Sequence, residues 1–251
     1  MTQVDHFNVC GINITNGRRE DIGAIIDAEN SEGRKVNLAF CNAHTAEHAF
    51  KNKAFMKALN RMLVVNDGIG IEIAARINNG RGFKENLNGT DFIPWFLGRT
   101  SMRRRIFLIG AQPHVVSRTS SVLADAFPQH RVVGVRDGYF DVRETDDLMR
   151  EVERSGADTL LVALGNPRQE IFMQQVTDRT KVKLAIGVGA LFDFMTGEAI
   201  RAPRLVRRMR LEWFYRLARE PARMARRYLV GTPYVLGYSL RYRLAQSFGG
   251  H

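Results

Sequence analysis

The stretch RMLVVNDGIGIEI, residues 61–73, contains a short apolar run that ends at an Asn-Asp-Gly sequence. Leu63, Val64 and Val65 favour β-structure and lack polar alternation, which is typical of a strand buried on both faces in a parallel sheet. Two glycines follow Asp67, and residues 69–77 then carry apolar side chains at helical spacing. Asp67 is therefore expected between a strand and a helix, at the edge where open α/β sheets bind ligands. Asp is also a favoured N-cap, so helix capping and catalysis are both open interpretations of Asp67.

The rest of the chain alternates predicted strands with predicted helices. Apolar runs predict an edge strand or hairpin at residues 7–14 and strands at 35–41, 106–109, 131–135, 159–164 and 183–188. Helical spacing predicts helices at residues 18–30, 90–97, 115–126, 146–155 and 166–176, with Thr90 as the N-cap of the second. It also predicts helical structure from the end of the second strand up to Asn60, with a break near Asn52. Residues 80–89 are polar and glycine-rich and predict a loop. This alternation predicts an α/β fold, a mostly parallel sheet with helices on both faces.

Charge is distributed unevenly along the chain. The net charge is +11, and residues 201–251 hold twelve Arg, no Lys and two acidic residues, Glu212 and Glu220. Residues 1–200 hold 25 basic and 24 acidic residues, so they are close to neutral. We therefore expect a core at 1–200 and a helical basic C-terminal appendage at 201–251. Arg binds phosphate through paired hydrogen bonds, so the appendage suits a diphosphate or lipid headgroups, with a generic solvated basic face as the alternative.

The sequence lacks the features expected of a disulfide-stabilised, secreted or membrane-spanning protein. Cys10 and Cys41 show neither a metal-binding spacing nor a disulfide framework, which fits the reducing cytosol. The first nine residues lack the basic and apolar regions of a signal peptide, and no apolar run reaches the roughly 18–20 residues of a membrane-spanning helix. Residues 228–240 can instead lie on an anionic membrane surface.

The motifs of the common cofactor and metal sites are also missing. The chain lacks a GxGxxG fingerprint, a P-loop, HExxH, GxSxG and an Asp-x-Asp clamp. His44 and His48 are four residues apart on an expected helix, where a surface or packing role is more common than metal binding. We therefore expect no metal ion and no cofactor.

A sharp local signal for a ligand site lies at residues 164–170. Asn166 is a good N-cap, Pro167 suits the first helical position, and Gln169 is placed to complete a capping box. A helix start directly after a parallel strand gathers free N–H groups, which bind phosphate well. Initiation of a helix alone explains Asn166 and Pro167, but it is a less complete explanation of a Gln169-Glu170 pair at the ligand-binding edge of the sheet.

Eight short motifs occur in a characteristic order along the chain: Asn42, Asp67-Gly68, Gly89-Thr90-Asp91, Asp137-Gly138-Tyr139-Phe140, Gly165-x-Pro167-x-Gln169-Glu170, Gly187-x-Gly189, Arg201-Ala202-Pro203 and Leu211-Glu212-Trp213. With them the sequence resembles the WecG/TagA/CpsF family of bacterial glycosyltransferases over roughly residues 5–230. The resemblance implies a Rossmann-like core and an inverting transfer of a sugar from a UDP-linked donor to a polyprenyl-diphosphate-linked sugar. The expected location is the cytoplasmic face of the cell membrane, in the synthesis of cell-surface polysaccharides or exopolysaccharides.

The resemblance also implies roles for individual residues. Asp67 matches the catalytic base. The residues expected to bind substrate are Asn42, Asn86, Asp91, Gln169, Glu170, Arg201, Arg216, Arg223 and Arg226, the last three on the acceptor diphosphate. The residues expected to bind the nucleotide are Gly110, Asp137, Tyr139, Gly165, Asn166 and Asp193.

Two positions depart from the family pattern. Phe40 stands where many members have Thr, and Asn86 stands where many have Arg. The donor sugar is therefore open between N-acetylmannosamine, its uronic acid and glucose, and the acceptor sugar is open as well. The alternatives to a transferase are a peripheral membrane-binding module with a catalytically idle nucleotide-binding core, and a different nucleotide-binding enzyme. Nucleic acid is not expected as a partner, because the basic residues interleave with apolar stretches. The sequence leaves the linkage position and the oligomeric state open, and a homo-oligomer is one arrangement that it allows.

Overall fold

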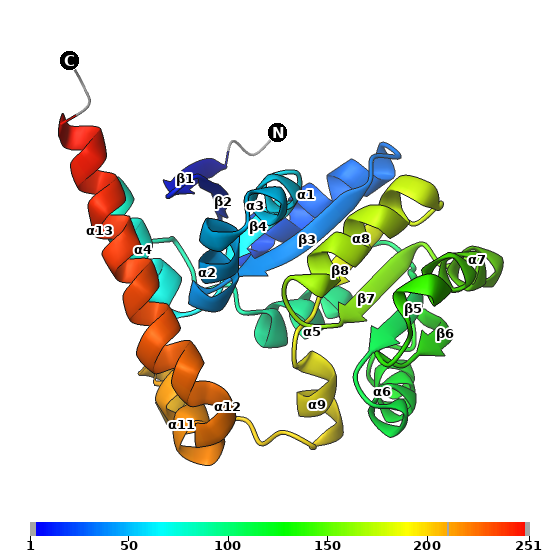
Figure 1. Ribbon diagram of the computed structural model, residues 1–251. Coiled ribbons are helices and arrows are strands. Elements are labelled where there is room, and N and C mark those ends of the chain that lie inside the picture. The colour runs from blue at the N-terminus through cyan, green and yellow to red at the C-terminus, as the bar shows by residue number, and fades with distance from the viewer. Residues whose placement is uncertain (1–3, 210, 249–251) are drawn as a thin grey trace. The chain divides into compact units, whose positions relative to one another are not determined.

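The computed structural model describes residues 4–209 and 211–248, except for the side chains of Val142, Arg204, Arg208, Arg223 and Phe248. Its central feature is a six-stranded sheet with the strand order β4-β3-β8-β7-β5-β6 (Figure 1). The strands are β3 (Val36–Cys41), β4 (Leu63–Asn66), β5 (Arg105–Gly110), β6 (Arg131–Arg136), β7 (Thr159–Ala163) and β8 (Leu184–Gly187). The β3–β8, β8–β7, β7–β5 and β5–β6 pairs are parallel. The predicted α/β fold with a mostly parallel sheet is confirmed.

Residues 5–16 form a separate hairpin, one of the two arrangements that the sequence left open. Strands β1 (Asp5–Val9) and β2 (Ile12–Asn16) pair antiparallel, with Val9 opposite Ile12. The two residues of the turn, Cys10 and Gly11, both have positive φ angles, of 51° and 91°.

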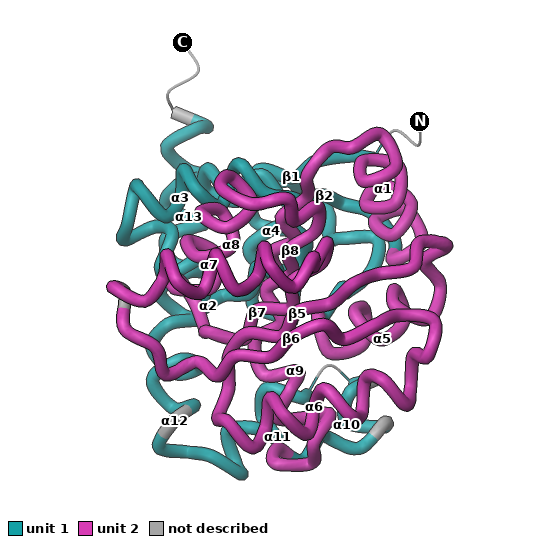
Figure 2. Tube along the Cα trace, turned by 90° about the vertical axis from the view of Figure 1, so that its right-hand side faces the viewer, with its two compact units in different colours: residues 1–18, 40–88, 200–251 teal, residues 19–39, 89–199 magenta. Residues whose placement is uncertain are grey.

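The chain divides into two compact units, which are coloured separately in Figure 2. Unit 1 comprises residues 1–18, 40–88 and 200–251, and unit 2 comprises residues 19–39 and 89–199. The boundary at residues 39 and 40 falls inside strand β3. Residues 200–251 thus belong to the same unit as the hairpin and β4. The expected division into a core at 1–200 and an appendage at 201–251 stays a prediction.

Unit 1 is mostly helical outside the hairpin and β4. Its helices are α2 (Ala43–Lys51), α3 (Lys53–Leu59), α4 (Ile69–Asn79), α10 (Arg204–Arg208), α11 (Glu212–Arg219), α12 (Pro221–Ala225), the π-helix η2 (Arg226–Gly231) and α13 (Thr232–Phe248). The predicted break near Asn52 is confirmed, because Asn52 ends α2 and accepts a hydrogen bond from the Phe55 N–H at the start of α3.

Helix α13 packs against α4 and α2 (Figure 1). Gly70 allows this close approach, since a Cβ there would lie 2.9 Å from the Ala43 Cβ and 3.2 Å from the Thr232 Cγ2. Val235 and Ser239 on α13 are completely buried, so the tail contributes to the core of unit 1.

Unit 2 holds the remaining helices and strands. Its helices are α1 (Arg19–Ser31), α5 (Gly89–Arg99), α6 (Pro113–Ala126), the 3-10 helix η1 (Val142–Glu144), α7 (Thr145–Ser155), α8 (Arg168–Arg179) and α9 (Leu191–Thr196). The expectation that Thr90 caps α5 is wrong: the helix already begins at Gly89, so Thr90 lies within its first turn.

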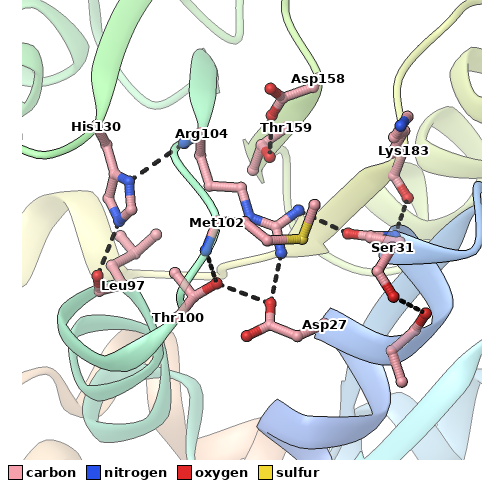
Figure 3. A network of polar contacts seen from close by, with 12 residues as sticks. Asp27, Ser31, Leu97, Thr100, Met102, Arg104, His130, Asp158, Thr159 and Lys183 are labelled. Atoms are coloured by element: carbon pink, nitrogen blue, oxygen red, sulfur yellow. Dashed lines mark hydrogen bonds and ion pairs between the residues drawn. The ribbon is translucent and has the colours of Figure 1, made fainter.

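A buried polar network joins α1, α5 and the start of β5 in unit 2 (Figure 3). Arg104 is only 2% exposed, and it donates to the Asn30 Oδ1 at 2.6 Å and the Asp27 Oδ1 at 2.8 Å. Thr100 donates to the same oxygen of Asp27 at 2.7 Å. A buried charge needs such partners to be tolerated, so we assign Arg104 a structural role.

Candidate active site

The carboxylate of Asp67 lies directly after β4, where the sequence placed it. The backbone N–H of Asp67 donates to the Cys41 carbonyl at 2.8 Å, and the Asn42 Nδ2 donates to the Asp67 Oδ2 at 3.3 Å. The N-cap of α4 is Gly68, so Asp67 does not occupy the capping position. Asp67 is only partly buried, so its carboxylate keeps some contact with solvent.

Asn42 uses both ends of its amide in this arrangement. Its Oδ1 accepts from the backbone N–H groups of His44 and Thr45, at 3.0 and 3.1 Å, and thereby caps α2. Its Nδ2 remains to donate to Asp67. Asn42 therefore connects the start of α2 to Asp67 and orients the carboxylate. The expected contact of Asn42 with substrate stays a prediction.

The loop at residues 80–88 is held against β4 and the start of α4. The Asn86 Oδ1 accepts from the Gly68 N–H at 2.7 Å, and the Asn66 Nδ2 donates to the Glu85 carbonyl at 2.9 Å. Glu72, only 6% exposed, accepts from the Phe83 N–H at 3.1 Å. The predicted substrate residue Asn86 is thus engaged with the turn that carries Asp67. Sequence reasoning missed Asn66 and Glu72, because nothing in their spacing shows what they contact.

Arg201 begins the tail and reaches back to the same loop. Its Nη2 donates to the Asn88 Oδ1 at 3.4 Å, and its Nε lies 4.0 Å from the Glu212 Oε1 at the start of α11. Asn42 therefore contacts Asp67 directly, Asn86 contacts the next residue, Gly68, and Arg201 contacts Asn88, two residues after Asn86.

The other predicted tail residues lie on the helices of unit 1. Arg216 is half-buried on α11, Arg226 is exposed at the first position of η2, and the side chain of Arg223 lies outside the described residues. His44 on α2 is influenced by a charged residue of η2. Burial lowers the pKa of His44 to about 4, and Arg227 of η2 and the neighbouring His48 lower it further. The His44 and His48 Nε2 atoms are 3.3 Å apart. The packing role expected for this pair is consistent with these contacts.

The start of α8 in unit 2 differs from the sequence prediction. Asn166 does not cap this helix, and no capping box forms: the N-cap is Pro167, which has no side-chain cap hydrogen bond. The Asn166 Nδ2 donates instead to the Glu170 Oε1, which also accepts from the Gln169 Nε2 at 2.8 Å. The Asn166–Pro167 peptide bond is cis.

The predicted nucleotide residues at the ends of β5 and β6 lie together in unit 2. Gly110 has a φ angle of 121°, and a Cβ there would lie 2.3 Å from the Ala163 carbonyl oxygen at the end of β7. The Gly138 N–H donates to the Ala111 carbonyl at 2.9 Å, and the Asp137 Oδ1 accepts from the Tyr139 N–H at 2.8 Å. The Tyr139 side chain is 75% exposed and available for contact with a ligand.

Arg168 connects this turn to the start of α8, near Gly165 and Asn166. It donates to the backbone carbonyls of Gly138 at 3.2 Å and Phe140 at 2.9 Å. Sequence reasoning missed Arg168, although it stands inside a recognised motif. Asp91 on α5 and Asp193 on α9 are half-buried in unit 2, and their expected roles in binding substrate and nucleotide stay predictions.

The described residues give two further findings about the site and its setting. They contain no group of three or more His, Cys, Asp or Glu side chains placed to hold a metal ion. Among the same residues, no helix has both the length and the apolar content needed to cross a membrane.

A parallel sheet with polar residues at the ends of several strands is typical of the Rossmann-like class, whose members bind nucleotides at that edge. The chain belongs to the glycosyl transferase WecG/TagA/CpsF family, whose model matches residues 7–249. It is 32% identical over 209 residues to the N-acetylglucosaminyldiphosphoundecaprenol N-acetyl-beta-D-mannosaminyltransferase of Bacillus subtilis (strain 168), covering 82% of this chain and 76% of that protein. A protein of the same description from Bacillus spizizenii is 30% identical over 191 residues, 75% of this chain and 73% of its own. The resemblance seen in the sequence is confirmed.

Proposed function

We propose that the chain is an inverting, metal-independent glycosyltransferase that moves a sugar from a UDP-sugar to a polyprenyl-diphosphate-linked sugar. Family membership and the descriptions of the two Bacillus relatives support the reaction class and the lipid-linked acceptor. N-acetylmannosamine is the donor sugar that these descriptions favour. Its uronic acid and glucose remain alternatives because of Phe40 and Asn86. The site of action is the inner face of the cell membrane, in polysaccharide biosynthesis.

The observation that carries this proposal is the environment of Asp67. Asn42 orients the carboxylate of Asp67, and Asn86 holds the N–H of the following residue, so both sides of the turn are fixed. A general base must be held within hydrogen-bond reach of the proton that it abstracts. An oriented and partly exposed carboxylate at the end of a strand supports this role for Asp67.

The reaction is a single displacement at the anomeric carbon of the donor. Asp67 accepts the proton of the acceptor hydroxyl group while that oxygen forms a bond to the anomeric carbon. The bond between this carbon and the diphosphate oxygen breaks, and UDP leaves with the electron pair. Attack opposite to the leaving group inverts the configuration.

We assign the nucleotide to unit 2, at Gly110, Asp137, Tyr139, Gly165, Asn166 and Asp193. The start of α8 supports this assignment, because free N–H groups and the helix dipole stabilise phosphate charge. The arginines of the tail are assigned to the acceptor diphosphate, for which the guanidinium group is well suited.

The tail also supports docking on the membrane. Most large apolar side chains that are exposed in the described part of the chain belong to it: Leu205, Met209, Phe214, Leu229, Val230, Tyr234, Tyr238, Leu240 and Leu244. The same segment carries twelve Arg and two acidic residues. Exposed apolar and cationic side chains on one set of helices bind anionic bilayers.

The proposal is tested by incubating the protein with radiolabelled UDP-N-acetylmannosamine, its uronic acid or UDP-glucose and a synthetic lipid-diphosphate acceptor. Transfer to the lipid, with inverted configuration by NMR, is expected for one of these donors. Vesicle binding without transfer or hydrolysis of any donor would favour the membrane-binding module. Hydrolysis without transfer would favour a different nucleotide-binding enzyme.

The role of Asp67 is tested by Asp67→Asn. Loss of the base should lower turnover by roughly 10²–10⁴-fold. The fold should survive, since an Asn carbonyl oxygen can still accept from Asn42. Asp125→Asn, at an exposed position of α6, is the matched control and should keep full activity. Near-normal turnover of Asp67→Asn would show that Asp67 is not the base.

A further inference from the structure

Two adjacent buried side chains at the start of α8 each have an oxygen without a partner. Gln169 is 3% exposed and Glu170 is completely buried. The Gln169 Oε1 and the Glu170 Oε2 have no hydrogen-bond partner among the described residues. A buried polar atom without a partner is costly, so such atoms call for a functional explanation.

The contacts of Glu170 indicate that its carboxyl group is neutral. The hydrogen bonds that it receives from the Gln169 and Asn166 side chains both fall on Oε1, and no Arg or Lys of the described chain pairs with it. An ionised carboxylate buried without a cation is strongly disfavoured. Burial accordingly raises the pKa of Glu170, and the hydrogen bonds from Gln169, from its own backbone N–H and from Asn166 oppose this shift only in part. Oε1 is then the carbonyl oxygen, and Oε2 carries the proton.

These contacts also determine which way the Gln169 amide faces. Its Nε2 donates to Glu170, so its Oε1 is the atom left for another group. Gly187, at the end of β8, leaves room for this orientation, since a Cβ there would lie 2.8 Å from the Gln169 Nε2. A buried carbonyl oxygen requires a donor, and the oxygens of an ionised diphosphate supply only acceptors. The missing partner is therefore an O–H or N–H group.

We propose that Glu170, as a neutral carboxylic acid, is a positioning residue that holds the Gln169 amide so that its carbonyl oxygen accepts a hydrogen bond from a hydroxyl group of the donor sugar nucleotide. This inference rests on the proposed function and refines it. Glu170 then acts through Gln169 and does not itself contact the substrate, unlike the role expected from the sequence.

The test compares steady-state kinetics of the wild type with four variants: Glu170→Gln, Glu170→Ala, Gln169→Ala and the double alanine variant. Glu170→Gln keeps a carbonyl oxygen for both amide donors, so its kcat/KM for the donor should stay within about threefold of wild type. Glu170→Ala and Gln169→Ala should each lower this value about ten- to a hundredfold, as expected for one lost or misplaced buried hydrogen bond. The KM for the lipid acceptor should not change.

The double variant separates positioning from an independent role. If Glu170 acts through Gln169, removing Glu170 should cost nothing further once Gln169 is alanine. Multiplicative losses in the double variant would overturn the inference, as would a Glu170→Gln variant as impaired as Glu170→Ala.

A second measurement does not require activity. The difference infrared spectrum between wild type and Glu170→Gln at pH 7 should contain the C=O stretch of a protonated carboxyl group. Carboxylate bands in its place would overturn the inference, even if Glu170→Ala fails to fold. A wild-type protein that transfers no sugar would contradict the proposed function, whereas the infrared result bears on Glu170 alone.

Discussion

The protonation of His44 links the stability of unit 1 to pH, and replacing His44 by Gln should remove this link. His44 lies on α2, and its pKa is lowered to about 4 by burial, then by Arg227 and His48, with a smaller effect of Arg226 and an opposing effect of Glu47. Gln is neutral at every pH, and its amide can still form a hydrogen bond with the His48 ring. The substitution therefore removes the titration with little change in shape.

The size of the effect follows from the shift. A pKa that falls from 6.5 to about 4 corresponds to about 3.4 kcal/mol. Because the His44 side chain is 32% exposed, solvent screening reduces this value, and we expect about 1–2 kcal/mol. The folded-state pKa is the lower one, so the unfolded chain binds the proton first as the pH falls. The stabilising contribution is complete above pH 6.5 and is lost as the pH falls toward 4.

The assay is urea unfolding of wild type and His44→Gln between pH 7.5 and 4. At pH 7.5 His44 is neutral in both states, so the difference between the two proteins there gives the effect of the substitution apart from titration. Below pH 6.5 the wild type should lose about 1–2 kcal/mol relative to the variant. Parallel curves over the whole range would show that the folded protein does not disfavour protonated His44, and the reasoning from burial and Arg227 would be wrong.

Four further predictions address the site, the tail and the buried carboxyl group. Transfer should persist in excess EDTA; complete loss that Mg²⁺ or Mn²⁺ restores would mean that a metal ion stabilises the leaving UDP. Gly68→Ala should lower the free energy of unfolding by about 1–3 kcal/mol, because Gly68 has a φ angle of 87°, and unchanged stability would argue against strain at this turn. Replacing Arg216, Arg223 and Arg226 by Gln should reduce transfer but leave most vesicle binding, whereas lost binding with normal transfer to a soluble acceptor would make them membrane anchors. The raised pKa of Glu170 contributes stability that is complete below its ordinary value of 4.5 and is lost as the pH rises, so Glu170→Gln should gain stability over wild type above pH 4.5; a constant difference would contradict this.

Local patterns in the sequence predicted most of the strands and helices, but residues 191–196, expected in a loop, form α9. The run Leu63–Val65 has no polar alternation, and it forms β4, a strand of the sheet. Asn52 interrupts a helical region: α2 ends there, and the Asn52 side chain caps the following helix, α3. Such patterns depend only on residues that are close in the sequence, because backbone propensity and the spacing of apolar side chains act over a few residues. The position of Asp67 directly after a strand and the uneven charge of the chain also follow from the sequence by itself.

Tertiary structure alone decided what the side chains of the candidate site contact. The side-chain amide oxygen of Asn86, Oδ1, accepts from the backbone N–H of Gly68, 18 residues away, although the sequence suggested only a substrate contact. Asn166 was a plausible N-cap, but its amide donates to Glu170 instead. Local capping rules describe only the hydrogen bonds that a side chain can form with its own helix. In this structure Asn166 forms a hydrogen bond with the buried carboxyl group of Glu170 and does not cap α8. Which groups are buried together depends on how distant segments pack, and residue spacing along the chain does not contain that information.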